Sequence, residues 1–268
     1  GATADIEMAY TYKKEHISEN SVEYEMRDSA GYSVPHNGKE LYMIYSMRAN
    51  NTLDANRMEA YLQDTYRFTS KGGHTHFTLN YGVRMSHWSF NKETIVSPRV
   101  SLGIIPAYSE NTTFRFAAGL YYQAPFFKEL RDTSTVNGIT YANLNEKIKS
   151  PRSIHFIAGY DYRFRINNLR YRFSAEAYYK ALGNFIPYSV NNVKVVYYGE
   201  NRASGHATGI DLKLYGEFVP GTDSWLTFSL MKTRQTLYGV SLPLPTDQRY
   251  SLNLHFTDYF PGTERWRM

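Results

Sequence analysis

Two long polar and aromatic segments, residues 124–152 and 183–203, hold the side chains whose chemistry best suits ligand capture. Aromatic rings can stack on the face of a sugar, while Asn, Asp and Arg can hydrogen-bond its hydroxyls or grip an anionic metal chelate. The same residue types are common in any solvent-exposed loop, so composition alone selects no ligand. The candidate ligand-binding residues are Phe126, Arg131, Tyr141, Tyr188, Tyr197, Tyr198 and Arg202.

The rest of the chain offers no comparable chemistry. The sequence has no Cys, which excludes disulfides, thiolate zinc ligands and a cysteine nucleophile. His74 and His76 lie two apart beside a Gly-rich turn, but no third metal ligand follows nearby, and a solvated turn explains them. Nucleophile-elbow, phosphate-loop, HExxH and calcium-loop patterns do not occur. We therefore expect no enzyme activity, no cofactor and no metal site.

Charge and hydropathy narrow the class of protein further. The net charge is +5, yet Lys and Arg alternate with apolar residues instead of forming a patch, so we expect no nucleic-acid partner. Mean hydropathy is −0.51, and no apolar run approaches the roughly 20 residues of a spanning helix. A transmembrane β-barrel can be this hydrophilic, because only alternate residues face lipid. The 25 Tyr suit both strands and membrane–water boundaries.

The clearest strand pattern lies in residues 170–180, where apolar and polar side chains alternate. Tyr171, Phe173, Ala175, Ala177 and Tyr179 share one face, and Arg170, Arg172, Ser174, Glu176 and Lys180 share the other. Period two is the strand period, and this stretch is longer than the usual strand of about 5–6 residues. Its length is enough to cross the hydrocarbon layer of a membrane.

Ten segments repeat this pattern, and we expect an eleventh near Arg265. The ten are 4–15, 56–69, 74–87, 97–106, 112–123, 153–165, 170–182, 204–219, 224–237 and 247–259. Asp64 interrupts the apolar face of 56–69. The tripeptides Ser97–Arg99 and Ser150–Arg152 each open a strand after a long link, where the missing donor of their Pro is tolerated, and Asp247–Arg249 has a related place.

Short and long links alternate between these segments. The short links are 70–73, 107–111, 166–169, 220–223 and 261–264, all rich in turn residues. The long links are 16–55, 88–96, 124–152, 183–203 and 238–246. Bacterial outer-membrane barrels have short periplasmic turns and long outer loops, so the alternation predicts this topology. Within 16–55, the patterns at residues 22–27 and 41–45 indicate strand structure that extends above the membrane. We do not expect another spanning strand there.

These patterns predict an all-β fold: an antiparallel up-and-down transmembrane β-barrel, present as an incomplete fragment of about 10–11 strands. We expect a single domain over residues 1–268, truncated at both ends. The apolar faces should contact outer-membrane lipid and the polar faces should line the lumen.

Several motifs in order along the chain resemble the barrel of TonB-dependent outer-membrane receptors, most closely those of Bacteroidetes. They are Tyr61–Tyr66, Tyr81–Arg84, Ser97–Arg99, Phe114–Pro125, Ala207–Leu212, Phe218–Gly221 and Thr246–Arg249. The resemblance implies active uptake of a scarce nutrient, such as a metal chelate or an oligosaccharide, through a plugged barrel in the outer membrane of a Gram-negative cell. It also implies that the TonB energy-transducing complex acts through a plug region absent from this sequence.

Two other classes of protein remain open on the residues alone. One is a passive or differently built outer-membrane barrel. The other is a soluble all-β carbohydrate-binding module, although long strands and alternating links disfavour it.

Overall fold

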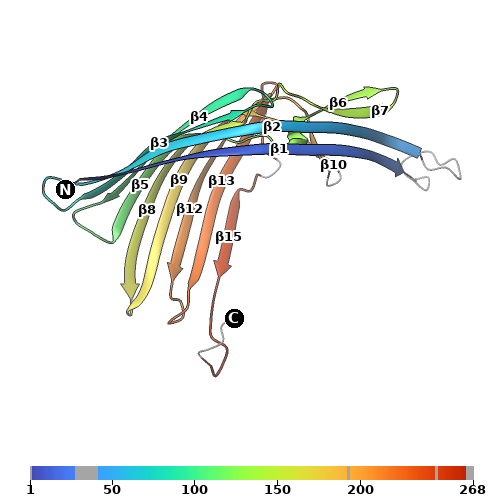
Figure 1. The fold of residues 1–268 in the computed structure, drawn as a ribbon. Helices are drawn as coiled ribbons and strands as arrows, with labels where there is room; N and C mark the ends of the chain where they lie inside the picture. Colours follow the sequence, from blue (N-terminus) through green and yellow to red (C-terminus); the bar gives the residue numbers. More distant parts are fainter. Residues whose placement is uncertain (1, 28–41, 192–193, 245–246, 264–268) are drawn as a thin grey trace.

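The computed structural model describes residues 2–27, 42–191, 194–244 and 247–263, and in this part of the chain nearly all regular structure is β. Figure 1 shows one long curved sheet whose strands run side by side from β1 to β15. The expected eleventh strand near Arg265 lies outside the described residues. No helix in the described part is long and apolar enough to cross a bilayer.

Ten strands form the body of the sheet, and each joins its neighbour in antiparallel register. In spatial order they are β1 (Thr3–Arg27), β2 (Tyr42–Thr69), β3 (His76–Trp88), β4 (Glu93–Ile105), β5 (Thr112–Tyr122), β8 (Arg152–Ile166), β9 (Leu169–Phe185), β12 (Ala203–Gly216), β13 (Ser224–Leu237) and β15 (Tyr250–His255). All ten predicted strands and the up-and-down order are confirmed.

The sheet is open in the described residues. β1 pairs only with β2, and β15 pairs only with β13, so the two outermost strands do not meet. This arrangement fits the expected incomplete barrel. The sheet curves across its width (Figure 1).

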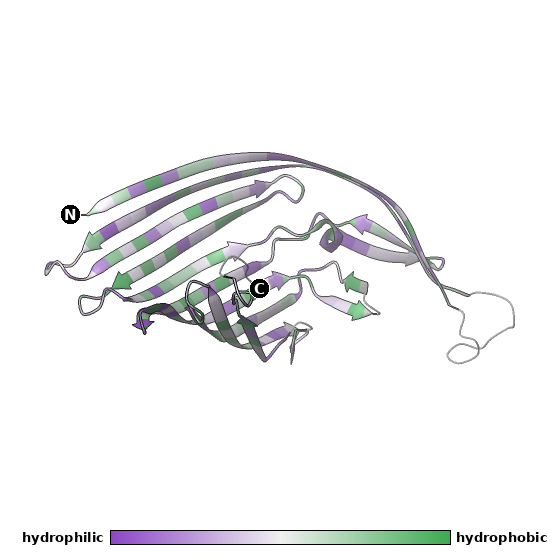
Figure 2. Ribbon diagram, turned by 90° about the horizontal axis from the view of Figure 1, so that it is seen from below, coloured by the Kyte–Doolittle hydropathy of each residue, from purple (hydrophilic) through white to green (hydrophobic). Residues whose placement is uncertain are grey.

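Cross-strand register places all the predicted apolar faces on one side of the sheet. Phe156 pairs with Tyr179, which pairs with Thr208, and Ala158 pairs with Ala177, which pairs with Ile210. Figure 2 shows the resulting alternation of hydrophilic and hydrophobic residues along the strands. Many outward side chains remain exposed to the surroundings, as expected of a surface that lipid would cover.

Aromatic rings gather on the outward face toward the end with the short turns. Their contacts link neighbouring strands: Phe68 with Phe77 at 4.8 Å, Phe114 with Tyr160 at 5.4 Å, and Phe164 with Tyr171 at 5.6 Å between ring centroids. Aromatic girdles of this kind mark membrane–water boundaries in outer-membrane barrels.

The turns follow their sequences closely. Asn167 and Asn168 have φ of 49° and 65°, so they form the two-residue hairpin turn that needs positive φ at both positions. This turn joins β8 to β9 tightly and fixes the register of the inward-facing residues on both strands.

The predicted alternation of short and long links is wrong at one place. The link expected at 88–96 is only residues 89–92, because β4 begins at Glu93. Ser97–Arg99 therefore lies within β4 and does not open it. Pro98 is tolerated there because it lies just beyond the last pair of the β4–β5 ladder, Arg99 with Gly119, so no donor is required on that side.

The longest links contain structure of their own. β1 and β2 continue as one paired hairpin up to Arg27 and Tyr42, which confirms the predicted strand extension in 16–55 as far as it is described. The link 123–151 contains the 3-10 helix η1 (Phe127–Leu130) and the hairpin of β6 (Arg131–Val136) and β7 (Ile139–Leu144). β10 (Tyr188–Asn191) pairs with β11 (Lys194–Tyr197), and β14 (Val240–Leu242) pairs antiparallel with the end of β13.

Candidate functional site

The long links at one end of the sheet pack into a folded assembly, which we call the loop platform. It consists of residues 123–151, 186–191 and 194–202, together with residues 47–55 of β2 and the end of β3. Its buried centre consists of Leu53, Ala55, Trp88, Leu130, Ile148 and Ile186, each at most 4% exposed. Phe90, Phe127, Leu144 and Tyr197 surround this centre. These links are therefore held by a hydrophobic core of their own, which sequence patterns did not reveal.

Strand β7 fixes the loop platform to the wall. It pairs in parallel with β2, with Met47 opposite Thr140 and Ala49 opposite Ala142. β3 pairs with β2 only up to Arg57, so β7 takes the part of the β2 edge that β3 leaves free. Buried Asn51 donates to the Ala142 carbonyl at 2.9 Å and to Glu19 at 3.0 Å, which ties β1, β2 and β7 together.

The side chains of Asn201 and Glu93 join the long links to each other and to β4. Asn201 donates to the carbonyls of Lys149 and Asn184 at 2.8 and 2.6 Å, and it accepts from the Lys149 amide at 2.6 Å. Glu93 accepts from the hydroxyl of buried Ser150 at 2.6 Å. Ser150–Arg152 thus ends its link against β4 and begins β8, as predicted.

The seven candidate residues fall into different environments within the loop platform. Phe126 and Tyr198 are 61% and 57% exposed, and Tyr141 on β7 is 38% exposed. Tyr188 and Tyr197 face each other across the β10–β11 hairpin, with ring centroids 5.8 Å apart. Burial, with Glu129 nearby, raises the pKa of the Tyr197 hydroxyl. Tyr197 also packs against the buried centre that includes Leu130 and Ile148, so the structure brings both long links together.

Both candidate arginines already have partners in the protein. Arg131 forms an ion pair with Glu19, in which the two side chains are only 17% and 10% exposed, and burial lowers the pKa of Arg131. Arg202 donates to Glu200 at 3.0 Å and to the Tyr238 hydroxyl at 3.3 Å. Arg131 therefore anchors β6 to β1, whereas Arg202 keeps a surface position.

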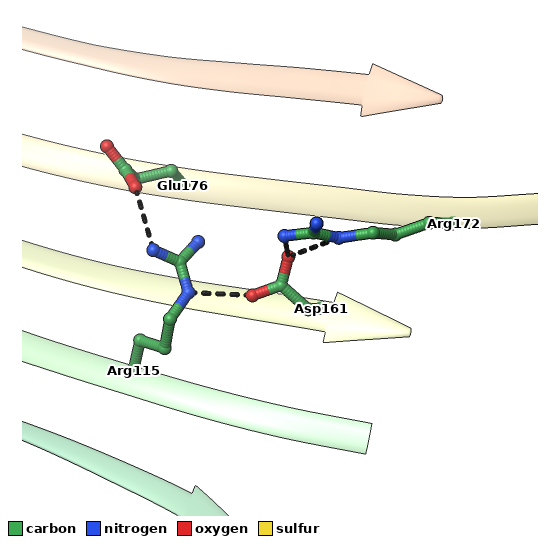
Figure 3. A network of polar contacts seen from close by, with 4 residues as sticks. All are labelled: Arg115, Asp161, Arg172 and Glu176. Atoms are coloured by element: carbon green, nitrogen blue, oxygen red, sulfur yellow. Dashed lines mark hydrogen bonds and ion pairs between the residues drawn. The ribbon is translucent and has the colours of Figure 1, made fainter. Parts of the chain in front are cut away.

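A second polar site lies on the inner face of the sheet, in the middle of the wall (Figure 3). Asp161 on β8 accepts from Arg115 Nε on β5 at 2.7 Å and from Arg172 Nη2 on β9 at 2.8 Å. Arg115 also lies 3.6 Å from Glu176 on β9. Asp161 is 6% exposed, so its charge is compensated by two guanidinium groups from the two neighbouring strands.

Strand parity already placed Arg115, Asp161 and Arg172 on one face, but only the register between β5, β8 and β9 brings them into contact. Within the described residues, no group of three or more His, Asp or Glu side chains is placed to hold a metal ion.

A curved sheet with an apolar outer face, a charged inner face and packed loops at one end is the wall of an outer-membrane type of β-barrel. The family model "TonB dependent receptor-like, beta-barrel" matches residues 1–268, and this chain therefore belongs to that family.

Solved structures of similar fold come from the same class of protein. The outer membrane transporter YddB of Escherichia coli has a TM-score of 0.56 and 15% identity, covering 87% of this chain and 31% of its own. A mutant of the ferric enterobactin receptor of Pseudomonas aeruginosa, solved with enterobactin, has a TM-score of 0.53 and 16% identity, covering 76% and 30%. The copper transporter OprC has a TM-score of 0.50 and 13% identity, covering 89% and 37%.

The chain thus spans about a third of the length of these structures, and the likeness to them concerns the fold. Among proteins with curated functions, none matches this sequence.

Proposed function

We propose that this chain forms part of the wall and the ligand-capturing loops of a receptor that takes up a scarce nutrient across the outer membrane. The loop platform carries this proposal. These links have a buried core, a parallel strand pair and a shared Asn201 contact, so they support one another in a single folded unit. Such a rigid platform can hold exposed rings in fixed positions for a ligand, which limits the entropy lost on binding.

The nutrient is a metal chelate, an oligosaccharide or a molecule of similar polarity. The exposed rings of Phe126, Tyr141 and Tyr198 suit stacking, and Arg202, four residues after Tyr198, offers a charged donor. Two of the similar structures are named for ferric enterobactin and copper, which supports a chelated metal as one cargo. Energy would come from the TonB complex through a plug region outside this sequence, with outer-membrane lipid around the wall.

Uptake by the full-length receptor in whole cells tests the proposal. We expect uptake to stop when TonB is deleted, whereas a passive pore would continue to admit solute. Replacing Phe126 and Tyr198 together by Ala should weaken ligand capture while the barrel still folds. Tyr108 is 77% exposed in the short link 106–111 at the opposite end, so Tyr108→Ala is the matched control and should leave capture unchanged.

The orientation of the wall can be tested separately. Ser134→Cys on β6 should react with a membrane-impermeant thiol reagent on intact cells. Gly72→Cys in the 70–75 turn, where an added Cβ meets nothing within 4 Å, should react only after the outer membrane is opened. Labelling at Gly72 in intact cells would contradict the proposed topology.

A further inference from the structure

The outer face of β8, β9, β12 and β13 carries cations only near the loop platform. At the short-turn end, the outermost outward-facing residues are Ile166, Leu169, Gly216 and Ser224. At the opposite end, the outward-facing residues include Arg152, His206, Lys232 and Arg234. Between these ends the four strands have no outward-facing Asp, Glu, Lys or Arg. The wall therefore presents an uncharged surface to one membrane boundary and a basic surface to the other.

The register gathers the basic residues of three strands. Lys232 and Arg234 stand two residues apart on β13, and Arg234 pairs with His206 on β12. Arg152 on β8 pairs with Gly183 on β9, and its Nε lies 2.9 Å from where a Cβ on this Gly would stand. Because Gly183 has no side chain, Arg152 can lie across β9, the strand that separates β8 from β12. We call Arg152, Lys232 and Arg234 the outer basic cluster.

The described residues do not neutralise this cluster. In that part of the chain Arg152, Lys232 and Arg234 form no ion pair within 4.0 Å. None of their cross-strand neighbours in the ladder is acidic. Asp247, which lies beside this part of β13, is occupied by Thr233 and by an ion pair of its own. The cluster can therefore take an anionic partner from outside these strands.

An apolar recess of about 620 Å³ lies on the same face, nearer the middle of the wall. Ala118, Ala158 and Ala177 line it. The rings of Phe156 and Tyr179 stand beside these small residues, so the surface is concave here. Tyr179 shares its level on the sheet with Lys232, because both pair with Thr208. The recess thus borders the outer basic cluster on the side away from the loop platform.

The heights of the recess and the cluster match the two parts of a lipid. At about 3.3 Å per residue and a tilt of about 40°, Ala177 lies roughly 20 Å above the turn that precedes Leu169. The register places Lys232 and Arg234 level with Tyr179 and Ala181, at roughly 25 and 30 Å. An outer-membrane barrel has an apolar band about 25 Å tall. The recess therefore lies in the upper half of the band, and the cluster lies at its upper edge.

We propose that β8, β9, β12 and β13 bind an anionic phosphate lipid of the outer leaflet. One acyl chain lies in the recess, and the headgroup phosphate contacts Arg152, Lys232 and Arg234. Charge complementarity selects this occupant, because Arg binds phosphate through paired hydrogen bonds and basic clusters at a membrane surface attract anionic headgroups. The site lies on the lipid side of the wall, so it goes beyond the uptake proposed above and does not depend on the cargo.

Binding of lipid A to the purified full-length receptor in detergent tests this proposal, with phosphatidylcholine as the lipid of no net charge. We expect lipid A to bind more tightly than phosphatidylcholine. The variant carrying Arg152→Gln, Lys232→Gln and Arg234→Gln should bind lipid A more weakly by about fivefold per charge removed. Lys213→Gln is the matched control, because Lys213 lies on β12 but faces inward, opposite Ser174 and Thr227. It should leave lipid A binding unchanged.

A second pair of variants tests the recess without changing any charge. Ala158→Phe places a ring in the recess and should weaken lipid A binding. Ala60→Phe adds the same ring to the outer face of β2, opposite Tyr10 and Met85, and should not weaken it. Both rings face lipid and are apolar, so the barrel should fold in each variant.

Three results would overturn the proposal. Equal binding of lipid A and phosphatidylcholine would show that the headgroup charge is not recognised. Lipid A binding that survives either the triple replacement or Ala158→Phe would remove the cluster or the recess from the site. If inorganic phosphate raised the melting temperature of the wild-type receptor as much as lipid A does, a free anion would fill the site and the lipid assignment would be wrong.

Discussion

Replacing Ala175 on β9 by Arg should strongly destabilise the full-length receptor. Ala175 pairs with Tyr160 and Leu212, so its side chain belongs to the apolar outer face. It lies six residues above the start of β9 at Leu169. At about 3.3 Å per residue and a tilt of about 40°, this places Ala175 roughly 15 Å above the turn, close to the middle of an apolar band about 25 Å tall. A lipid-facing Arg at mid-membrane costs about 2–4 kcal/mol.

Ser174→Arg provides the matched control, because it introduces the same side chain one residue away on the same strand. Ser174 pairs with Asp161 and Lys213 on the inner face, where the new guanidinium can stay hydrated or approach Asp161. Urea unfolding of the two variants in lipid vesicles, followed by tryptophan fluorescence, should show a lower free energy of unfolding for Ala175→Arg. If Ser174→Arg proved more damaging, the assignment of the two faces would be wrong.

Three further outcomes follow from the polar contacts. Asp161→Asn should lower the free energy of unfolding by about 1–3 kcal/mol, since it leaves two half-exposed guanidiniums without their shared carboxylate, and unchanged urea unfolding would contradict this. Asn201→Ala should leave the barrel intact but make residues 183–203 sensitive to limited proteolysis, because the contacts to Lys149 and Asn184 are lost. The backbone and side chain of Thr233 donate to Asp247 and lower the pKa of this carboxylate. The ionised carboxylate therefore stabilises the fold at pH values above its ordinary pKa of about 4, and this stabilisation is lost as the pH falls below that value. The acid-induced drop in melting temperature should therefore be smaller in Asp247→Asn.

The spanning strands were predictable because the alternation of apolar and polar residues follows from the local geometry of a strand. Each residue of β9 from Arg170 to Lys180 faces either lipid or the interior, so the pattern in sequence carries the face assignment directly. The same holds for the turn at Asn167 and Asn168, whose positive φ suits Asn. No long-range information is required for either feature.

The start of β4 was missed because a local rule was applied without knowledge of the neighbours. Pro98 suggested a strand opening, yet a Pro within a strand costs little where the pairing with one neighbouring strand has already ended. β5 pairs with β4 only from Arg99 onward, although β5 itself continues to Tyr122, and nothing near Pro98 in the sequence shows where this pairing ends. Strand boundaries of this kind depend on register, which is a property of pairs of strands.

The candidate site shows the same division between local and pairwise information. The sequence correctly placed ring-bearing and charged residues in the long links, but it could not show that Arg131 is held by Glu19 or that Tyr197 packs against a buried core. The contact between Arg131 and Glu19 joins segments that are more than 100 residues apart in the sequence. Once they are known, Phe126 and Tyr198 stand out as rings that the protein leaves exposed on a rigid platform. Capture of a ligand should therefore depend more on these two residues than on Arg131, whose replacement should instead loosen β6 from β1.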